Sequence, residues 1–270
     1  MSKNPKKLAY LVRVECLKMV HSAKASHIGS ALSIVDILTI LYSQILEYDS
    51  ANPDLNSRDR FILSKGHACC AVYATLAHCG YFNVNLLKTF AENGSDFMSH
   101  ISHKVPGVEF STGSLGHGLP YAVGKAMAAK RNKQDWRTYV LTSDGELDEG
   151  SNWEAIMFSA HFQLDNLTII VDYNKLQSLT STEETIRLEP LVSKFESFGI
   201  FCIEVDGHNF EELKKAFVKA STVKNKPTVI LAHTIKGKGV SFMENSVKWH
   251  YKSPSDKQLK DALKEVEKAL

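Results

Sequence analysis

The sequence is poor in several features that would assign a protein to a class at once. Its 270 residues hold only five cysteines, an odd number with no CxxC spacing. We therefore expect reduced thiols in a cytoplasmic protein rather than a disulfide framework. Acidic and basic residues are also nearly balanced, because the formal net charge is only +2. A nucleic-acid partner is therefore not indicated.

Long apolar runs are also scarce. The N-terminal region is not a signal peptide, because Arg13, Glu15 and Lys18 would interrupt its apolar core. The most apolar long stretch, Ala31 to Leu46, contains Asp36 and is too short to span a bilayer. No membrane partner is therefore expected.

The sequence also lacks repeats and low-complexity linkers, so nothing in it marks a domain boundary. The length allows one large domain or two small ones. We expect a single domain over residues 1–270, in which residues 251–270 form a charged amphipathic helical tail at the surface.

Apolar segments that alternate with helical patterns make up most of the chain. Helices are expected over Leu8–Val20, from a cap at Ser33 to Leu46, from Lys65–His67 to Cys79, and at Gly118–Lys130, Trp153–His161, Leu191–Phe198 and Phe210–Val218. Buried strands are expected at Phe61–Leu63, Thr138–Thr142, Leu167–Val171, Phe201–Val205 and Thr228–Ala232. This alternation predicts an α/β fold with a doubly wound, mostly parallel sheet and helices on both faces.

Two polar side chains follow consecutive predicted strands. Asp144 follows Thr138–Thr142, and Asn174 follows Leu167–Val171. Each has an ordinary role when taken alone, Asp144 as a helix cap and Asn174 in a turn. Together they offer hard oxygen ligands at the sheet edge where α/β folds bind ligands, and Mg²⁺ completes such a shell with phosphate oxygens and water. Because Gly145 lacks a Cβ, the backbone can approach a phosphate, and the pair predicts a metal-bridged diphosphate.

Histidines are unusually frequent in the predicted loops and turns. They are His27, His67, His100, His103 and His250. A single loop histidine is more often solvated or bonded in the core. Zinc is an alternative, but no two have the paired spacing of a Cys/His site, and even His100 and His103 lack local partners. Several histidines at one sheet edge suit hydrogen bonding to a polyhydroxylated substrate and proton transfer near neutral pH.

Two glycine-rich turns complete the candidate set. Thr112–Gly118 precedes a predicted helix and lacks the P-loop pattern, so alone it indicates only helix entry. Lys236–Gly239 follows the last predicted strand. It is either a solvated turn or a place where Lys236 or Lys238 meets anionic groups.

Taken together, these segments resemble the N-terminal half of transketolase, a thiamine diphosphate enzyme, over nearly the whole chain. The most specific segments are Leu63–His67, Pro106–Glu109, Thr112–Gly116, the Asp144–Asn174 pair, Glu204–His208 and Thr234–Gly239. The Asp-Gly and Asn signals are shared by all thiamine diphosphate enzymes. The motifs around His27 and His67, together with Leu115–Gly118, narrow the resemblance to the transketolase-like branch.

The resemblance implies a role for each matching residue. Asp144, Asn174 and the carbonyl of Leu176 would bind Mg²⁺, for which Ca²⁺ or Mn²⁺ could substitute. The other contacts to thiamine diphosphate would come from His67, Leu115, Gly116 and Gly145. The catalytic set would be His27, His67, His100, His250 and Glu149, the last of which would link two active sites across a subunit interface.

The resemblance also implies what this chain lacks. Thiamine chemistry needs a carboxylate against the aminopyrimidine ring, and in the family that glutamate lies in a second domain. The chain begins with Met and ends in a predicted helix, so we expect one subunit of a split transketolase. Its partner would be a C-terminal subunit with the pyrimidine-binding domain, two copies of each. Gly118–Lys130 and Glu146–Glu149 are the expected interface segments.

The expected reaction is the transfer of a two-carbon ketol unit from a ketose phosphate to an aldose phosphate. The rival enzymes are a 1-deoxyxylulose-phosphate synthase and a subunit of an α-keto-acid dehydrogenase, although Lys65–His67 and Leu115–Gly118 speak against the dehydrogenase. A non-catalytic remnant that only binds a partner or thiamine diphosphate is the other alternative. The intact Asp144, Asn174 and His67 argue against such decay.

Overall fold

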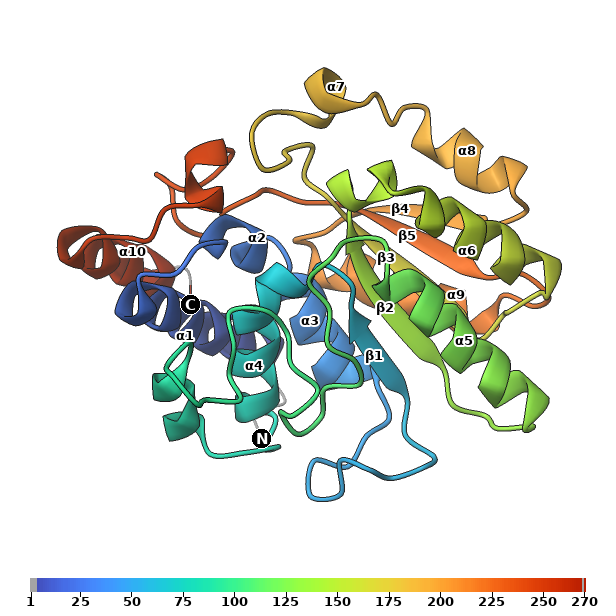
Figure 1. The fold of residues 1–270 in the computed structure, drawn as a ribbon, viewed down its shortest axis with the longest axis horizontal. Coiled ribbons are helices and arrows are strands. Elements are labelled where there is room, and N and C mark those ends of the chain that lie inside the picture. Colours follow the sequence, from blue (N-terminus) through green and yellow to red (C-terminus); the bar gives the residue numbers. More distant parts are fainter. Residues whose placement is uncertain (1–3, 269) are drawn as a thin grey trace.

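A five-stranded parallel sheet lies at the centre of the computed structural model, which describes residues 4–268 and 270 (Figure 1). The strands are β1 (Arg60–Leu63), β2 (Thr138–Ser143), β3 (Leu167–Tyr173), β4 (Phe201–Asp206) and β5 (Thr228–His233). Their order is β1-β2-β3-β5-β4, and every neighbouring pair is parallel. All five predicted strands and the doubly wound α/β class are confirmed.

Alternate side chains of the strands enter two hydrophobic cores, one on each face of the sheet. Leu141 and Ile170 join the first core, whereas Val140 and Ile169 join the second. The first core is covered by α1 (Pro5–Ala23), α3 (Val35–Ile40), α4 (Cys69–His78), α9 (Phe210–Thr222) and α10 (Asp256–Lys268). The second is covered by α5 (Gly118–Arg131), α6 (Gly150–His161) and α8 (Leu191–Ser197). Cover on both faces explains why the strands are continuous apolar runs.

The long apolar stretch near the N-terminus forms α2 (Ile28–Leu32), α3 and the π-helical η1 (Leu41–Ile45). By length and composition alone, the window Ile28–Ile45 could cross a membrane, which corrects the expectation that the stretch is too short. However, 83% of that window is buried inside the fold, as in a core helix. The expected cap at Ser33 is also wrong, because its hydroxyl donates to Oδ2 of Asp172 at 2.7 Å instead.

Helix α5 and the turn after β2, the expected interface segments, are partly buried within this chain. Ala122, Ala126 and Ala129 of α5 are buried against the chain's own sheet, and the side chain of Glu146 is fully buried. These groups pack inside this chain, so they are not available to a partner. Gly124 and Glu149 are exposed.

The remaining elements are short. They are η2 (Gly66–Ala68), η3 (Val84–Thr89), η4 (Gly145–Asp148), α7 (Thr182–Thr185) and η5 (Val247–His250). Residues 91–117 form a long segment without helix or strand. The predicted tail is a helix, α10, which packs on α1 through Ala262 and Val266; residue 269 of that prediction lies outside the described residues.

Candidate active site

Asp144 lies at the carboxyl end of β2, directly beside the end of β3. Its backbone N–H donates to the carbonyl of Asp172 at 3.2 Å. Its carboxylate accepts from the N–H of Gly145 at 2.7 Å and from the N–H of Lys175 at 2.5 Å. The residue is only 1% exposed, and burial, together with Asp172, raises its pKa to about 7. A cation at this carboxylate would stabilise its charged form.

Asn174 is oriented by a buried ion pair that the sequence did not reveal. Its amide nitrogen donates to Oδ2 of Asp172 at 3.0 Å, and the same oxygen accepts from Nζ of Lys65 at 2.6 Å. The Asp172 and Lys65 side chains are both fully buried. Burial would raise the pKa of Asp172, but the Lys65 ammonium holds it below its usual value. Because the amide nitrogen is fixed on Asp172, the side-chain oxygen of Asn174 faces Leu176. It accepts a hydrogen bond from the Leu176 N–H at 3.0 Å.

The Lys236 turn connects the segment after β3 to the N-terminal helices. The buried ammonium of Lys236 donates to the carbonyls of Leu176 and Gln177 at 2.9 and 2.8 Å, and burial with the nearby Lys65 lowers its pKa to about 8. The next residue, Gly237, donates to the carbonyl of Gly29 at 2.9 Å. Lys236 is thus the lysine of the 236–239 turn that reaches the site.

Four of the predicted histidines gather in one cluster. The ring centroid of His27 lies 5.0 Å from that of His67, 5.0 Å from that of His250 and 5.7 Å from that of His100. His67 and His250 are 5.5 Å apart. His27 caps α2 with a left-handed backbone at φ 74°, a conformation that costs free energy and is common at functional sites. The adjacent Tyr251 ring, 58% exposed, is 4.8 Å from His250.

The cluster is electrically neutral near pH 7. Burial, reinforced by His100 and Lys236, lowers the pKa of His27 to about 4. Burial and Lys236 lower the pKa of His250 to about 3, and burial also lowers those of His67 and His100. Nδ1 of His250 is buried without a hydrogen-bond partner among the described residues. A neutral imidazole can donate or accept, so this cluster suits the hydroxyl groups of a substrate.

His103 does not belong to the cluster. Its ring is exposed and bonds to Oγ of Ser111 at 2.7 Å. His100, in contrast, packs against the glycine-rich turn, where a Cβ on Gly113 would come within 3.3 Å of its ring. Within residues 4–268 and 270, no group of three or more His, Cys, Asp and Glu side chains is placed to hold a metal ion.

The glycine-rich turn is tied to the same edge through Glu146. Glu146 accepts from the N–H of Gly116 at 2.9 Å and from the hydroxyl of Ser64 at 2.6 Å. Gly116 has φ 84°, and a Cβ there would lie 2.5 Å from Oγ of Ser151. Leu115 is half-buried in this turn, and its role toward a cofactor stays a prediction.

The residues at this edge fit a divalent ion and a diphosphate. Asp144 and Asn174 supply side-chain oxygens and Leu176 a carbonyl oxygen, which are ligand types that Mg²⁺ prefers. The ammonium of Lys236 is suited to the diphosphate charge. At Gly145, an added Cβ would come within 2.9 Å of the Gln177 side chain, so space is tight where a phosphate would approach.

Comparisons with known proteins identify the family of this chain. The chain matches the family model described as transketolase, thiamine diphosphate binding domain, over residues 4–266. One relative, a subunit of the apulose-4-phosphate transketolase of Phocaeicola vulgatus, is 42% identical over 258 residues, which are 96% of this chain and 92% of the relative. The 6-deoxy-6-sulfo-D-fructose transketolase subunit SqwG of a Clostridium species is 40% identical over 96% of this chain and 95% of the relative.

Solved structures extend the likeness to three dimensions. The transketolase from Campylobacter jejuni has a TM-score of 0.93 and 32% identity, covering 97% of this chain and 42% of that one. The transketolase from Leishmania mexicana has a TM-score of 0.86 and 30% identity, covering 98% of this chain and 45% of that one. This chain therefore spans less than half the length of either solved transketolase. The chain belongs to the transketolase family and corresponds to its thiamine diphosphate-binding domain.

Proposed function

We propose that this chain is the diphosphate- and Mg²⁺-binding subunit of a split transketolase. The assembled enzyme transfers a two-carbon ketol unit from a ketose phosphate to an aldose phosphate in the cytoplasm. The observation that carries the proposal is the cluster of neutral histidines, together with an oxygen-rich strand edge whose Leu176 carbonyl accepts from Lys236. Such a pairing combines a metal-diphosphate anchor with hydrogen-bonding groups for a sugar.

The residues of this chain have different roles according to where they lie in the site. Asp144, Asn174 and the Leu176 carbonyl hold Mg²⁺, and Lys236 contacts the diphosphate. Thiamine diphosphate, when bound, supplies the nucleophilic carbon and the electron sink for cleavage beside a carbonyl.

The histidines act on the substrate side of the site. His27, His67, His100 and His250 donate to or accept from substrate hydroxyls and move protons at them, which their neutral state allows. Glu149 is exposed at the N-cap of α6, and we assign it the role of linking to a second active site across an interface.

Two observations support a partner subunit. The site is an open sheet edge, and this chain covers only 42% of the solved Campylobacter transketolase. Relatives that match nearly end to end are named as subunits. We expect a C-terminal subunit that carries the pyrimidine-binding domain and its glutamate, in a two-plus-two assembly. The names of those relatives point to ketose-type substrates of unusual structure.

The direct test is ketol transfer by the purified chain with Mg²⁺ and thiamine diphosphate, with and without the partner. We expect turnover only with both subunits. A His103→Ala variant serves as a matched control for His100→Ala, because only His100 lies in the cluster. Full turnover by the isolated chain would overturn the split-enzyme proposal.

Titration with thiamine diphosphate and Mg²⁺ distinguishes the proposed subunit from a non-catalytic remnant. A non-catalytic remnant need not bind Mg²⁺ and thiamine diphosphate, whereas the proposed subunit binds them together with its partner. Binding that persists unchanged in Asp144→Ala would contradict the metal assignment.

A further inference from the structure

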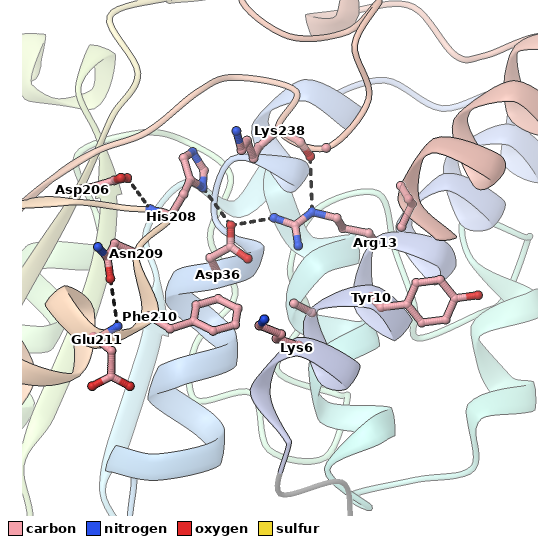
Figure 2. Close-up of a pocket in the computed structure, with 13 residues that line it drawn as sticks. Lys6, Tyr10, Arg13, Asp36, Asp206, His208, Asn209, Phe210, Glu211 and Lys238 are labelled. Carbon is pink, nitrogen blue, oxygen red and sulfur yellow. Dashed lines mark hydrogen bonds and ion pairs between the residues drawn. The ribbon is translucent and has the colours of Figure 1, made fainter. Parts of the chain in front are cut away.

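A cavity of about 660 Å³ lies beside the loop of residues 235–239 (Figure 2). It is bounded by α1, the start of α9 and Lys238–Gly239, and neither Lys236 nor any histidine of the cluster lines it. One wall of the cavity contains a linked set of three side chains, Arg13, Asp36 and His208 (Figure 2). This set is hydrogen-bonded to the same 235–239 loop from which Lys236 reaches Leu176.

Two hydrogen bonds link the three side chains to one another, and two more connect them to the 235–239 loop. Oδ2 of Asp36 accepts from Arg13 at 2.6 Å and contacts Nδ1 of His208 at 2.8 Å. Arg13 donates through Nε to the carbonyl of Lys238 at 3.3 Å. The N–H of Ile235 donates to Nε2 of His208 at 2.8 Å. Both ends of the loop are therefore bonded to side chains that share one carboxylate.

The geometry fixes the protonation of His208. A backbone N–H can only donate, so Nε2 must accept the bond from Ile235 and carries no proton. The proton of the neutral ring is then on Nδ1 and is donated to Asp36. Burial would raise the pKa of Asp36, but Arg13 and His208 hold it below its usual value, so Asp36 is charged.

The loop needs such support because of its composition. Gly237 and Gly239 adopt φ values of 83° and 95°, which glycine tolerates but which leave the free loop with many conformations. A Cβ on Gly237 would lie 2.3 Å from the carbonyl of Met243, so glycine is required there. Between these ends, Lys236 extends a buried ammonium to the carbonyls of Leu176 and Gln177.

We infer that Arg13, Asp36 and His208 are positioning residues, which set the affinity for the diphosphate by fixing the loop that carries Lys236. This inference rests on the proposed function, because it concerns how the same cofactor site is held. The three residues do not contact the histidine cluster or the metal-binding oxygens in any bond that the structure shows. The hydrogen bonds of the set lead to the site through the backbone of residues 235–239.

Two isosteric variants of His208 separate positioning from general stability. Asn places its amide nitrogen near Nδ1, so His208→Asn keeps the bond to Asp36 and loses the acceptor for Ile235. Gln places its amide oxygen near Nε2, so His208→Gln keeps the acceptor for Ile235 and loses the bond to Asp36. Arg13→Lys is a second route, because it keeps a cation near Asp36 but lacks the guanidinium donor to Lys238. Tyr10 lines the same cavity, and Tyr10→Phe is the control.

The first measurement is hydrogen exchange of the 235–239 amides in the chain itself. We expect faster exchange in His208→Asn and Arg13→Lys but not in His208→Gln or Tyr10→Phe. The second is the dissociation constant of thiamine diphosphate at fixed Mg²⁺ in the assembly with the partner. His208→Asn should weaken binding about three- to tenfold, the range for one lost hydrogen bond, with turnover at saturating cofactor within about twofold of wild type.

A double-mutant cycle with Lys236→Met tests the route of the effect. If His208 acts through Lys236, His208→Asn should weaken cofactor binding far less in the Lys236→Met background than in the wild type. Equal effects in both backgrounds, or equal affinities for His208→Asn and His208→Gln, would overturn the inference. Failure of the wild-type assembly to bind thiamine diphosphate would instead refute the proposed function. Hydrogen exchange of the 235–239 amides would still test whether His208 and Arg13 hold the loop.

Discussion

Replacing Lys65 by Met is expected to destabilise the chain more than any exposed lysine replacement. Nζ of Lys65 lies 2.6 Å from Oδ2 of Asp172, and both side chains are fully buried. Removing one partner of a buried pair leaves an uncompensated charge, which typically costs about 3–5 kcal/mol. Ser33, Thr234 and Asn174 still donate to Asp172 in the variant, so we expect a loss near the lower end of that range.

The expected loss converts to a measurable shift of the melting temperature. Unfolding entropy of about 2.1 cal/mol/K per residue gives about 0.57 kcal/mol/K for a chain of this length. A loss of about 3–5 kcal/mol therefore lowers the melting temperature by about 5–9 °C. The double variant Lys65→Met/Asp172→Asn removes both charges and should regain at least half of the loss, because a neutral replacement of a buried pair is often tolerated.

Calorimetry or thermal circular dichroism of the full chain measures both variants. Lys238→Met is the matched control, because Lys238 pairs with Glu244 at 3.6 Å in a part-exposed position. Exposed pairs contribute about 0–1 kcal/mol, so its melting temperature should change by less than about 2 °C. The reasoning fails if Lys65→Met behaves like this control, or if the double variant is no more stable than the single one.

Three other outcomes follow from the site. Asp144→Ala should abolish cofactor-dependent turnover while thermal melting still shows a cooperative fold; normal affinity for thiamine diphosphate would contradict its role. His100→Ala should lower turnover with the partner at least tenfold while cofactor affinity changes little, whereas His103→Ala should match wild type in steady-state kinetics. Because the pKa of His27 falls to about 4 in the fold, the unfolded chain binds more protons below its ordinary pKa. Stability should thus fall as pH drops from about 6.5 to about 4, and less steeply in His27→Gln, as melting at several pH values would reveal.

Much of the fold was predictable from the sequence because strand burial leaves a strong local signal. Val140 and Ile169 belong to apolar runs that can only be strands covered on both faces, and all five predicted strands are present. The expected cap at Ser33 failed for a long-range reason. Its hydroxyl is engaged by Asp172, which lies 139 residues later in the chain. No local pattern encodes that partner.

Part of the candidate site was also predictable from the sequence, and part was not. Asp144 and Asn174 were recognisable because each follows a strand, and parallel strands bring their ends together. The support beneath them was not, because Lys65 follows β1 whereas Asp172 lies in β3, and their pairing depends on the register of β1 and β3 relative to β2. His100 could be distinguished from His103 only by the path of a long segment without helix or strand.

The charges at this edge explain why metal and diphosphate should bind together. Asp144 and Asp172 bring two carboxylates into a buried region, and Lys65 and Lys236 bring two ammonium groups, so the charged forms of these four cancel. A divalent cation alone would leave this buried region with excess positive charge, and a diphosphate alone would leave it negative. Either excess is costly in a site of low dielectric. Each ligand therefore relieves the cost that the other creates, and by linkage each should raise the affinity of the other by the same factor.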